Sequence, residues 1–265
     1  MEKNEIPQEA FDRPAAPLVS IITPCYNAAD TIADTIKSVQ SQTWQNWEML
    51  IVDDCSTDGS YKIISEAADD DKRIRALSTP KASGSPAAPR NMALQAARGR
   101  YVAFLDADDM WLPEKLDRQI RFMERHGYIF TYSDYEKMSV SGKRTGRRIR
   151  LRKSTSFWDI LESNSVPCLS AVLRRDIIGK IRFRNVPQED LVFWLEIMRR
   201  RNVVAYNIGE VLAVYRESRH SRSSNKLNMI RKQWYVLRRV EKVKRIPSLY
   251  FMAAYLLKGT IKYMK

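Results

Sequence analysis

Short apolar runs alternate with segments of helical spacing through the first half of this 265-residue chain, and this alternation restricts its fold more than any other feature. The apolar runs predict buried strands at residues 18–23, 48–52, 73–78, 101–105 and 128–133. The amphipathic segments between them predict helices at residues 31–42, 61–68, 90–97 and 113–126. Strands and helices that alternate over short connections form right-handed βαβ units. The pattern therefore predicts an α/β fold in which helices flank a mainly parallel, Rossmann-like sheet.

The pattern is weaker in the second half of the chain. Residues 137–153 hold eight Lys or Arg and no acid, which predicts an exposed basic loop or hairpin. The remaining regular segments predict helices at 157–163 and 191–200 and strands at 203–205 and 211–215.

The C-terminal residues are predicted to be helical again. Helical spacing resumes at Asn225, and we expect Pro247 to divide two helical segments. In the first segment, Ile230, Trp234 and Leu237 lie at helical spacing and would form the face that packs on the rest of the protein.

The formal net charge of +14 is unevenly distributed along the chain. Residues 1–136 carry 15 basic and 22 acidic side chains, whereas residues 219–265 carry 13 basic side chains against one acid, Glu241. The net charge alone would suit a basic nucleic-acid-binding protein, but the half with the regular pattern is acidic and contains no recognised nucleic-acid motif. We therefore expect no nucleic acid among the partners. The basic, aromatic tail instead predicts contact with an anionic membrane surface.

The sequence predicts a cytoplasmic protein that lies peripherally on the inner face of the cytoplasmic membrane. Its longest apolar run, Leu249–Leu257, covers nine residues, about half of what a helix needs to cross a bilayer. Residues 1–17 are polar and lack the apolar core of a signal peptide, so we expect a flexible lead there.

The three cysteines and two histidines are not clustered, which favours neither a disulfide framework nor a Cys/His metal site.

Acidic side chains follow two of the predicted parallel strands. Asp53 and Asp54 end the second strand, and Asp106 and Asp108 follow the fourth. Ligands of open α/β sheets bind beyond the carboxyl ends of the strands, so these groups are expected at the binding edge. Carboxylates one residue apart repel each other unless a cation offsets their charge, and oxygen ligands without His or Cys select Mg²⁺ or Mn²⁺. The alternative is turn and helix-capping chemistry, for Asp53-Asp54 and for Asp108-Asp109.

Two further segments supply candidate groups. A loop rich in Gly, Ser and Pro leads into the predicted helix at Arg90, and a guanidinium at a helix N-terminus suits a phosphate or a planar base. The alternative is a linker and an ordinary surface arginine. Glu189 and Asp190 precede an apolar helical segment. Apolar neighbours would raise the pKa of Asp190 into the range of a general base, whereas Glu189 is a candidate helix cap.

The order and spacing of these motifs resemble the family 2 inverting glycosyltransferases of the GT-A fold. The matching motifs are V-S-I-I-T-P-C-Y-N at 19–27, I-V-D-D-C-S-T-D-G-S at 51–60, R-N at 90–91, F-L-D-A-D-D at 104–109 and E-D at 189–190. We therefore expect a GT-A catalytic domain at 18–218 and basic amphipathic helices at 219–265. Within the domain, residues 18–109 would be the nucleotide-binding half and residues 110–218 the acceptor half.

The resemblance implies a role for each matched residue. The nucleotide-binding residues would be Thr23, Pro24, Tyr26, Asp53, Asp54, Arg90 and Asp106. Asp53 and Asp54 match the motif that recognises uracil and ribose, and either carboxylate suits either contact. Asp108 would bind the Mn²⁺ or Mg²⁺ that bridges the pyrophosphate, and Asp190 would be the general base. The acceptor or a lid over the diphosphate would be contacted by Glu189, Tyr215, Arg216 and the serine-rich residues that follow.

The implied reaction moves a sugar from a UDP-sugar to an acceptor hydroxyl with inversion at the anomeric carbon. The tail resembles that of enzymes that build bacterial O-antigen, capsule or exopolysaccharide units, which implies an acceptor linked to polyprenyl diphosphate. The chain departs from the family before R-N, where Pro86 and Pro89 stiffen the loop. The alternative enzyme is a nucleotidyltransferase acting on a sugar phosphate, but it would need a Gly-rich basic loop after the first strand.

Overall fold

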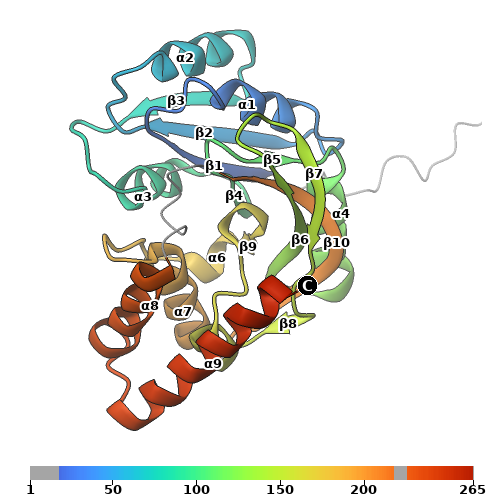
Figure 1. The fold of residues 1–265 in the computed structure, drawn as a ribbon. Coiled ribbons are helices and arrows are strands. Elements are labelled where there is room, and N and C mark those ends of the chain that lie inside the picture. The colour runs from blue at the N-terminus through green and yellow to red at the C-terminus, as the bar shows by residue number, and fades with distance from the viewer. Residues whose placement is uncertain (1–17, 218–225, 265) are drawn as a thin grey trace, which may run out of the picture.

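The computed structural model describes residues 18–217 and 226–264, and the predicted N-terminal lead lies outside them. Its centre is a ten-stranded sheet in the order β3-β2-β1-β4-β9-β6-β10-β5, with β7 paired to β6 and β8 to β10 (Figure 1). The strands are β1 (Val19–Cys25), β2 (Trp47–Asp53), β3 (Ile74–Ser78), β4 (Tyr101–Phe104), β5 (Met110–Trp111), β6 (Phe130–Met138), β7 (Arg144–Ile149), β8 (Ser154–Thr155), β9 (Val172–Arg174) and β10 (Ala205–Arg216).

Helices cover both faces of this sheet, as the alternating pattern predicts. The helices are α1 (Ile32–Gln40), α2 (Ser60–Asp70), α3 (Ala87–Ala96), α4 (Lys115–His126), α5 (Phe157–Glu162), α6 (Arg175–Ile178), α7 (Glu189–Arg201), α8 (Lys226–Tyr235) and α9 (Arg245–Met264). A 3-10 turn lies at Cys168–Ser170 and a π-helical turn at Val236–Val240. Buried side chains of α1, α2 and α4 pack in one core cluster, and those of α3, α5 and α7 in the other.

The first half of the sheet is parallel, and the second half is mixed. β3, β2, β1 and β4 pair in parallel, which confirms the βαβ prediction for this half. Beyond β4, the strand β9 runs antiparallel to both β4 and β6, and β10 returns parallel to β6. The two predicted halves of the catalytic domain therefore share one sheet.

Several elements of the second half differ from the sequence prediction. The strands predicted at 203–205 and 211–215 form one long strand, β10, whose register shifts between Asn207 and Ala213. The irregularity breaks the alternation of side chains, which is why the sequence indicates two short strands. For the basic residues 137–153, the structure confirms the hairpin alternative of the prediction, because β7 pairs antiparallel with β6. Strands β5 and β9 are two and three residues long, too short to give a periodic signal.

The prediction that Pro247 divides the C-terminal helices is wrong. The break lies before α9, at residues 241–244, where Lys242 has a φ of 54°. Pro247 instead lies in the first turn of α9, a position that tolerates proline because the first amides of a helix have no intrahelical acceptor. Among the described residues, no helix is long and apolar enough to cross a membrane.

The packing face predicted for the first C-terminal helix is also partly wrong. Leu237 is fully buried as expected, but Trp234 is 38% exposed. The buried positions are Gln233, Val236 and Leu237, and Gln233 donates its side-chain amide to the Leu161 carbonyl at 2.9 Å. That hydrogen bond satisfies a buried polar group at the α5 interface, so the helix turns Gln233 inward and Trp234 outward.

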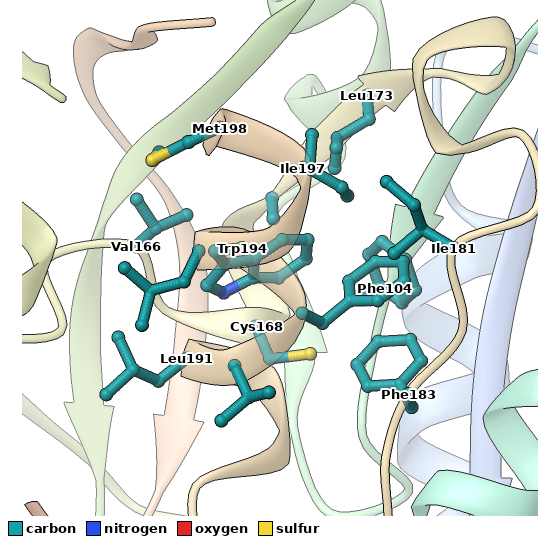
Figure 2. Packing of buried hydrophobic residues seen from close by; sticks show 14 of the residues in the cluster. Phe104, Val166, Cys168, Leu173, Ile181, Phe183, Leu191, Trp194, Ile197 and Met198 are labelled. Atoms are coloured by element: carbon teal, nitrogen blue, oxygen red, sulfur yellow. The ribbon is translucent and has the colours of Figure 1, made fainter. Parts of the chain in front are cut away.

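The core fixes α7 against the end of β4. Phe104, the last residue of β4, makes edge-to-face contacts with Phe183 and with Trp194 of α7, at centroid distances of 5.6 and 5.4 Å (Figure 2). Phe183 and Phe193 stack at 3.9 Å on the same side. Such aromatic pairs add about 0.5–1.5 kcal/mol each beyond the burial of their surface. Consequently the residues that follow β4 and those that begin α7 are held near each other.

Candidate active site

The loops after β1 and β2 are tied to each other by the S-T-D-G-S motif. The backbone amide of Asn27 donates to Ser56 Oγ at 2.9 Å, and the amide of Thr57 donates to Asn27 Oδ1 at 2.8 Å. The amide of Ala28 donates to Ser60 Oγ at 2.8 Å. Asn27 has a positive φ of 48°, an uncommon conformation that such a network can hold in place. The two strand ends therefore form one rigid rim beside the candidate site.

Asp53 and Asp54 are both buried but have different surroundings. Asp54 accepts hydrogen bonds from Thr79 Oγ1 at 2.8 Å, from Ser83 Oγ at 2.8 Å and from the Ser83 amide. Asp53 accepts one hydrogen bond, from the Ser56 amide to Oδ2 at 3.0 Å, while its Oδ1 is buried without a partner. A buried carboxylate oxygen without a donor is costly, and a ligand that supplies an N–H would satisfy it.

The other residues predicted after β1 lie at the same rim. Thr23 and Pro24 are buried in the last part of β1, and Thr23 Oγ1 has no hydrogen-bond partner. Tyr26 is 58% exposed, so its ring is available to a planar ligand.

The acidic residues after β4 differ in their exposure and in their partners. Asp106 is partly exposed, and Asp108 lies half-buried beside it. Burial, reinforced by the charge of Asp106, raises the pKa of Asp108 to about 6. Asp109 is buried and accepts the Arg216 amide at 2.9 Å, so it is not the cap of α4, which begins after Glu114. Asp109 instead fixes the end of β10.

Tyr215 and Arg216 end β10 rather than lie in a loop. Arg216 is buried, donates from Nη2 to Asp34 Oδ2 at 3.0 Å and donates from Nε to the Asp108 carbonyl at 2.9 Å. The ring of Tyr215 makes an edge-to-face contact with Tyr135. Arg216 thus places a fixed positive charge against the acidic loop. The predicted lid after it, residues 218–225, lies outside the described residues.

Arg90 links the two halves of the domain. Its side chain is 4% exposed, with Nη2 2.6 Å from Asp106 Oδ1 and Nη1 3.0 Å from Glu189 Oε1. The guanidinium lies 5.2 Å from the centre of the Phe183 ring. A contact between Arg90 and donor phosphates would therefore require these ion pairs to rearrange. In this structure the arginine connects a residue after β4 to the start of α7.

The R-N pair lies inside α3 rather than at its first residue. Pro86 is the N-cap residue and Pro89 falls in the first turn, so both prolines occupy positions that a helix start accepts. Asn91 then clamps the segment before α7, because its side chain donates to the Phe183 carbonyl and accepts the Phe183 amide, both at 2.8 Å. Asn91 of the R-N motif thus holds the segment that leads to Glu189 and Asp190.

Asp190 lies in the first turn of α7 and is half-buried. Its Oδ2 accepts a hydrogen bond from Asn164 Nδ2 at 2.9 Å. Burial, together with the charge of Glu189, raises the pKa of Asp190 to about 6. The preceding Gln188 has a φ of 55°, a strained backbone that aims the first residues of α7. A carboxyl with this pKa is ionised at neutral pH and is still basic enough to accept a proton.

The residues after β4 fit a divalent cation. Asp106 and Asp108 supply hard oxygen ligands, and burial together with the charge of Asp106 raises the pKa of Asp108, a cost that a cation would reduce. No group of three or more His, Cys, Asp or Glu side chains that could hold a metal exists in the described part of the chain. A cation here would therefore take its remaining ligands from water and from a bound diphosphate, as Mg²⁺ and Mn²⁺ commonly do.

Sequence reasoning missed three residues that shape this site. Asn164 bonds Asp190, Asp34 bonds Arg216, and Asn91 bonds the backbone of Phe183. Asn164 and Asp34 lie far in sequence from the groups they orient, so no local spacing indicates them. Only Asn91 could have been found from the sequence, because it belongs to the R-N motif.

The fold and the site define a glycosyltransferase of the GT-A fold. The family model described as glycosyl transferase family 2 matches residues 20–182. The putative teichuronic acid biosynthesis glycosyltransferase TuaG of Bacillus subtilis is 40% identical over 228 residues, which cover 86% of this chain and 90% of TuaG. The chain belongs to glycosyl transferase family 2.

A second relative has a more specific name. WfgD of Escherichia coli, a UDP-Glc:alpha-D-GlcNAc-diphosphoundecaprenol beta-1,3-glucosyltransferase, is 39% identical over 221 residues, which cover 83% of this chain and 85% of WfgD.

Solved structures share the fold at low sequence identity. S. aureus TarS 1-349 in complex with UDP-GlcNAc aligns with a TM-score of 0.67 at 19% identity, over 91% of this chain and 72% of that chain. The mannosyltransferase PcManGT of Pyrobaculum calidifontis, in complex with GDP-Man and Mn²⁺, aligns with a TM-score of 0.65 at 18% identity, over 90% and 68% of the two chains. Both likenesses concern the fold.

Removal of the Asn164 hydrogen bond is expected to shift the pH dependence of the reaction. Asn164→Leu keeps the branched shape of the side chain but removes a donor that favours ionised Asp190, so the pKa of Asp190 should rise above 6 by about one unit. In a plot of kcat against pH at saturating metal, the acid limb should therefore move to higher pH, since the base must be deprotonated. Ser165→Ala is the control, because Ser165 bonds the Ser163 carbonyl. Equal acid limbs in both variants would contradict the assignment.

Proposed function

We propose that this enzyme is a metal-dependent inverting glycosyltransferase that moves a sugar from a UDP-sugar to an acceptor linked to polyprenyl diphosphate, in surface polysaccharide synthesis. The observation that carries the proposal is the pair of ion pairs by which Arg90 joins Asp106, two residues before Asp108, to Glu189, the neighbour of Asp190. WfgD and WfaP, both relatives, are named for transfer to GlcNAc-diphosphoundecaprenol. A peripheral place at the inner face of the cytoplasmic membrane fits such an acceptor.

The nucleoside of the donor would lie on the rim formed by the loops after β1 and β2. Asp53 Oδ1 is the unsatisfied acceptor in that rim and would receive the N–H of uracil, while Tyr26 offers an exposed ring for the base. Asp54 is already saturated by Thr79 and Ser83, so we assign it the role of holding the loop at 79–85. Asp106 would contact the ribose.

The leaving group is a nucleoside diphosphate, on which negative charge grows as the glycosidic bond breaks. Asp108 would hold Mn²⁺ or Mg²⁺, which supplies the positive charge that stabilises this diphosphate. Arg216 is fixed beside the same loop and lowers the repulsion among its carboxylates.

The acceptor hydroxyl would be deprotonated by Asp190. Its carboxylate accepts the proton while the acceptor oxygen attacks the anomeric carbon from the side opposite the diphosphate, which inverts the configuration. Arg90 and Asn91 act as positioning residues, because one bonds Glu189 and the other bonds the backbone of Phe183 before α7. Glu189 contributes charge that keeps the pKa of Asp190 raised.

The test is a panel of nucleotide sugars with Mn²⁺ and a synthetic GlcNAc-diphosphate lipid, with products identified by mass spectrometry. We expect a disaccharide-diphosphate lipid and free UDP from one UDP-sugar, with a β-linkage from an α-linked donor. Release of pyrophosphate from a nucleoside triphosphate, with no sugar transfer to any acceptor, would favour the nucleotidyltransferase instead.

Asp53 and Asp54 are expected to respond differently to the same change. Asp53→Ala removes the free acceptor, so the Kd for UDP should rise at least tenfold with little change in stability. Asp54→Ala leaves Thr79 and Ser83 without their acceptor, so the free energy of unfolding should fall by about 1–3 kcal/mol. Calorimetric UDP titration and urea unfolding measure the two quantities. Equal effects of both variants on UDP binding would contradict the division of roles.

A further inference from the structure

Helix α9 carries apolar residues on both of its sides. The buried side includes Phe251 and Met252, which join the core. The opposite side is exposed and also apolar; its large residues are Ile246, Leu249, Tyr250, Leu256 and Leu257. Residues 246–257 contain no charged side chain. An exposed helix face of a globular protein is ordinarily polar, so this face is unusual.

These exposed residues form one continuous strip. Positions 246, 249, 250, 253, 256 and 257 recur every three or four residues, so they share one face of the helix. Trp158 of α5 borders the strip: it is 65% exposed and stacks on the buried-side Phe251 at 6.5 Å, while Tyr250 of the strip donates to Glu162 Oε1 of α5 at 3.4 Å. We use the term apolar strip for Trp158 together with Ile246, Leu249, Tyr250, Leu256 and Leu257.

The charged side chains at the start of α9 are basic. Arg239, Lys242, Lys244 and Arg245 are exposed, whereas Glu241 is paired with Arg199 at 2.7 Å. Figure 1 shows α9 along the outside of the molecule, at the end away from α1 and α2. An apolar helix face with Trp and Tyr and a basic border is the composition of a helix that lies in a membrane interface.

We propose that the apolar strip inserts into the interfacial layer of an anionic phospholipid bilayer, with α9 parallel to the membrane plane. The basic border favours anionic lipid over a second copy of this chain, since two copies would bring like charges together. Leu and Trp side chains that leave water for the acyl boundary supply the apolar part of the binding energy. Arg239, Lys242, Lys244 and Arg245 supply the electrostatic part.

The strip also lies close to the catalytic carboxyl along the chain. Trp158 belongs to α5, and Asn164, which donates to Asp190, follows only six residues later. Four of these six steps lie in α5 and two follow it outside the helix, where Ser163 is extended, so the separation is at most about 13 Å along the chain. Gln233 of α8 bonds the Leu161 carbonyl of the same segment. If the proposed function holds, on which this step rests, the bilayer would present a lipid-linked acceptor beside Asp190.

Vesicle binding tests the strip without donor, metal or acceptor. We expect the full chain to sediment with phosphatidylglycerol-containing vesicles, and less with pure phosphatidylcholine or at high salt. Leu249→Gln and Leu257→Gln together should lower the partition coefficient at least tenfold, because each removes an exposed apolar side chain from the interface. Tyr61→Gln, which changes an exposed aromatic residue of α2, is the control and should bind as the parent does. Brominated lipid should quench the fluorescence of Trp158.

Three results would overturn the proposal. One is no binding of the parent chain to anionic vesicles at low salt, and the second is unchanged binding of the double variant. The third is concentration-dependent dimerisation that the double variant abolishes while vesicle binding persists, which would assign the strip to a second copy. These outcomes are independent of the catalytic proposal, because binding is measured without turnover. With a short-chain, water-soluble acceptor, the double variant should retain the parent kcat/KM.

Discussion

Asp190→Asn is expected to lower kcat by about 10³ or more while the Kd for UDP stays within about twofold of the parent value. The carboxylate that would take the proton of the acceptor hydroxyl is replaced by an amide of the same shape that cannot accept it, and a general base contributes about 10²–10⁴. The rim formed by the loops after β1 and β2, where we place the nucleoside of the donor, contains no atom of Asp190. The loss should therefore appear in the chemical step, measured by single-turnover transfer at saturating donor.

The stability of this variant distinguishes a lost base from a damaged fold. The raised pKa of Asp190 means that its ionised form is unfavourable in the folded protein above pH 6, so the amide should raise the unfolding midpoint at neutral pH. Asp117→Asn, which breaks only a surface pair with Arg121, serves as the matched control and should keep the parent kcat. Near-normal turnover of Asp190→Asn would remove this residue as the base.

Asp108→Asn is expected to lower kcat/KM by about 10³ or more and to abolish the dependence of UDP affinity on Mn²⁺. The change removes a carboxylate that we expect to hold the cation, so the charge that develops on the diphosphate loses its stabilisation. Mn²⁺ binding in the presence of UDP can be followed by electron paramagnetic resonance, apart from turnover. Without metal, the variant should unfold at a higher temperature than the parent at neutral pH, because the charged form of Asp108 is unfavourable there.

The control for the metal prediction is Asp70→Asn, an exposed change at the end of α2. It should bind Mn²⁺ and UDP as the parent does. If Asp108→Asn retained the Mn²⁺ dependence of the parent, Asp108 would not be the ligand. If the parent itself showed no effect of chelation on transfer, the requirement for a divalent cation would be wrong.

The first half of the fold could be predicted from the sequence because its signals are local. Strands such as Trp47–Asp53 contain a continuous apolar run, here Met49–Val52, and each is followed by a helix with one apolar face. The second half depends on contacts between distant residues. The antiparallel strand Val172–Arg174 exists because it fits between β4 and β6, and its three residues carry no periodicity.

The candidate site divides in the same way. Asp53, Asp106 and Asp108 could be placed at one edge because they follow parallel strands, and the resemblance supplied their roles. The pairing of Arg90 with both Asp106 and Glu189 could not be predicted, since it joins residues 16 and 99 positions apart. The difference between Asp53 and Asp54 is likewise a matter of hydrogen-bond partners, which the sequence does not show.

The buried position of Arg90 has a consequence for how this enzyme can evolve. Removing one partner of a buried ion pair costs about 3–5 kcal/mol, a large share of the 5–15 kcal/mol by which a protein is ordinarily stable. A lineage that altered Arg90 alone, whose side chain is 4% exposed, would cross a poorly folded intermediate. New sugar and acceptor preferences are therefore expected to arise by substitutions around the ion pairs of Arg90. The residues Asp106, Arg90 and Glu189 should change together or remain as they are.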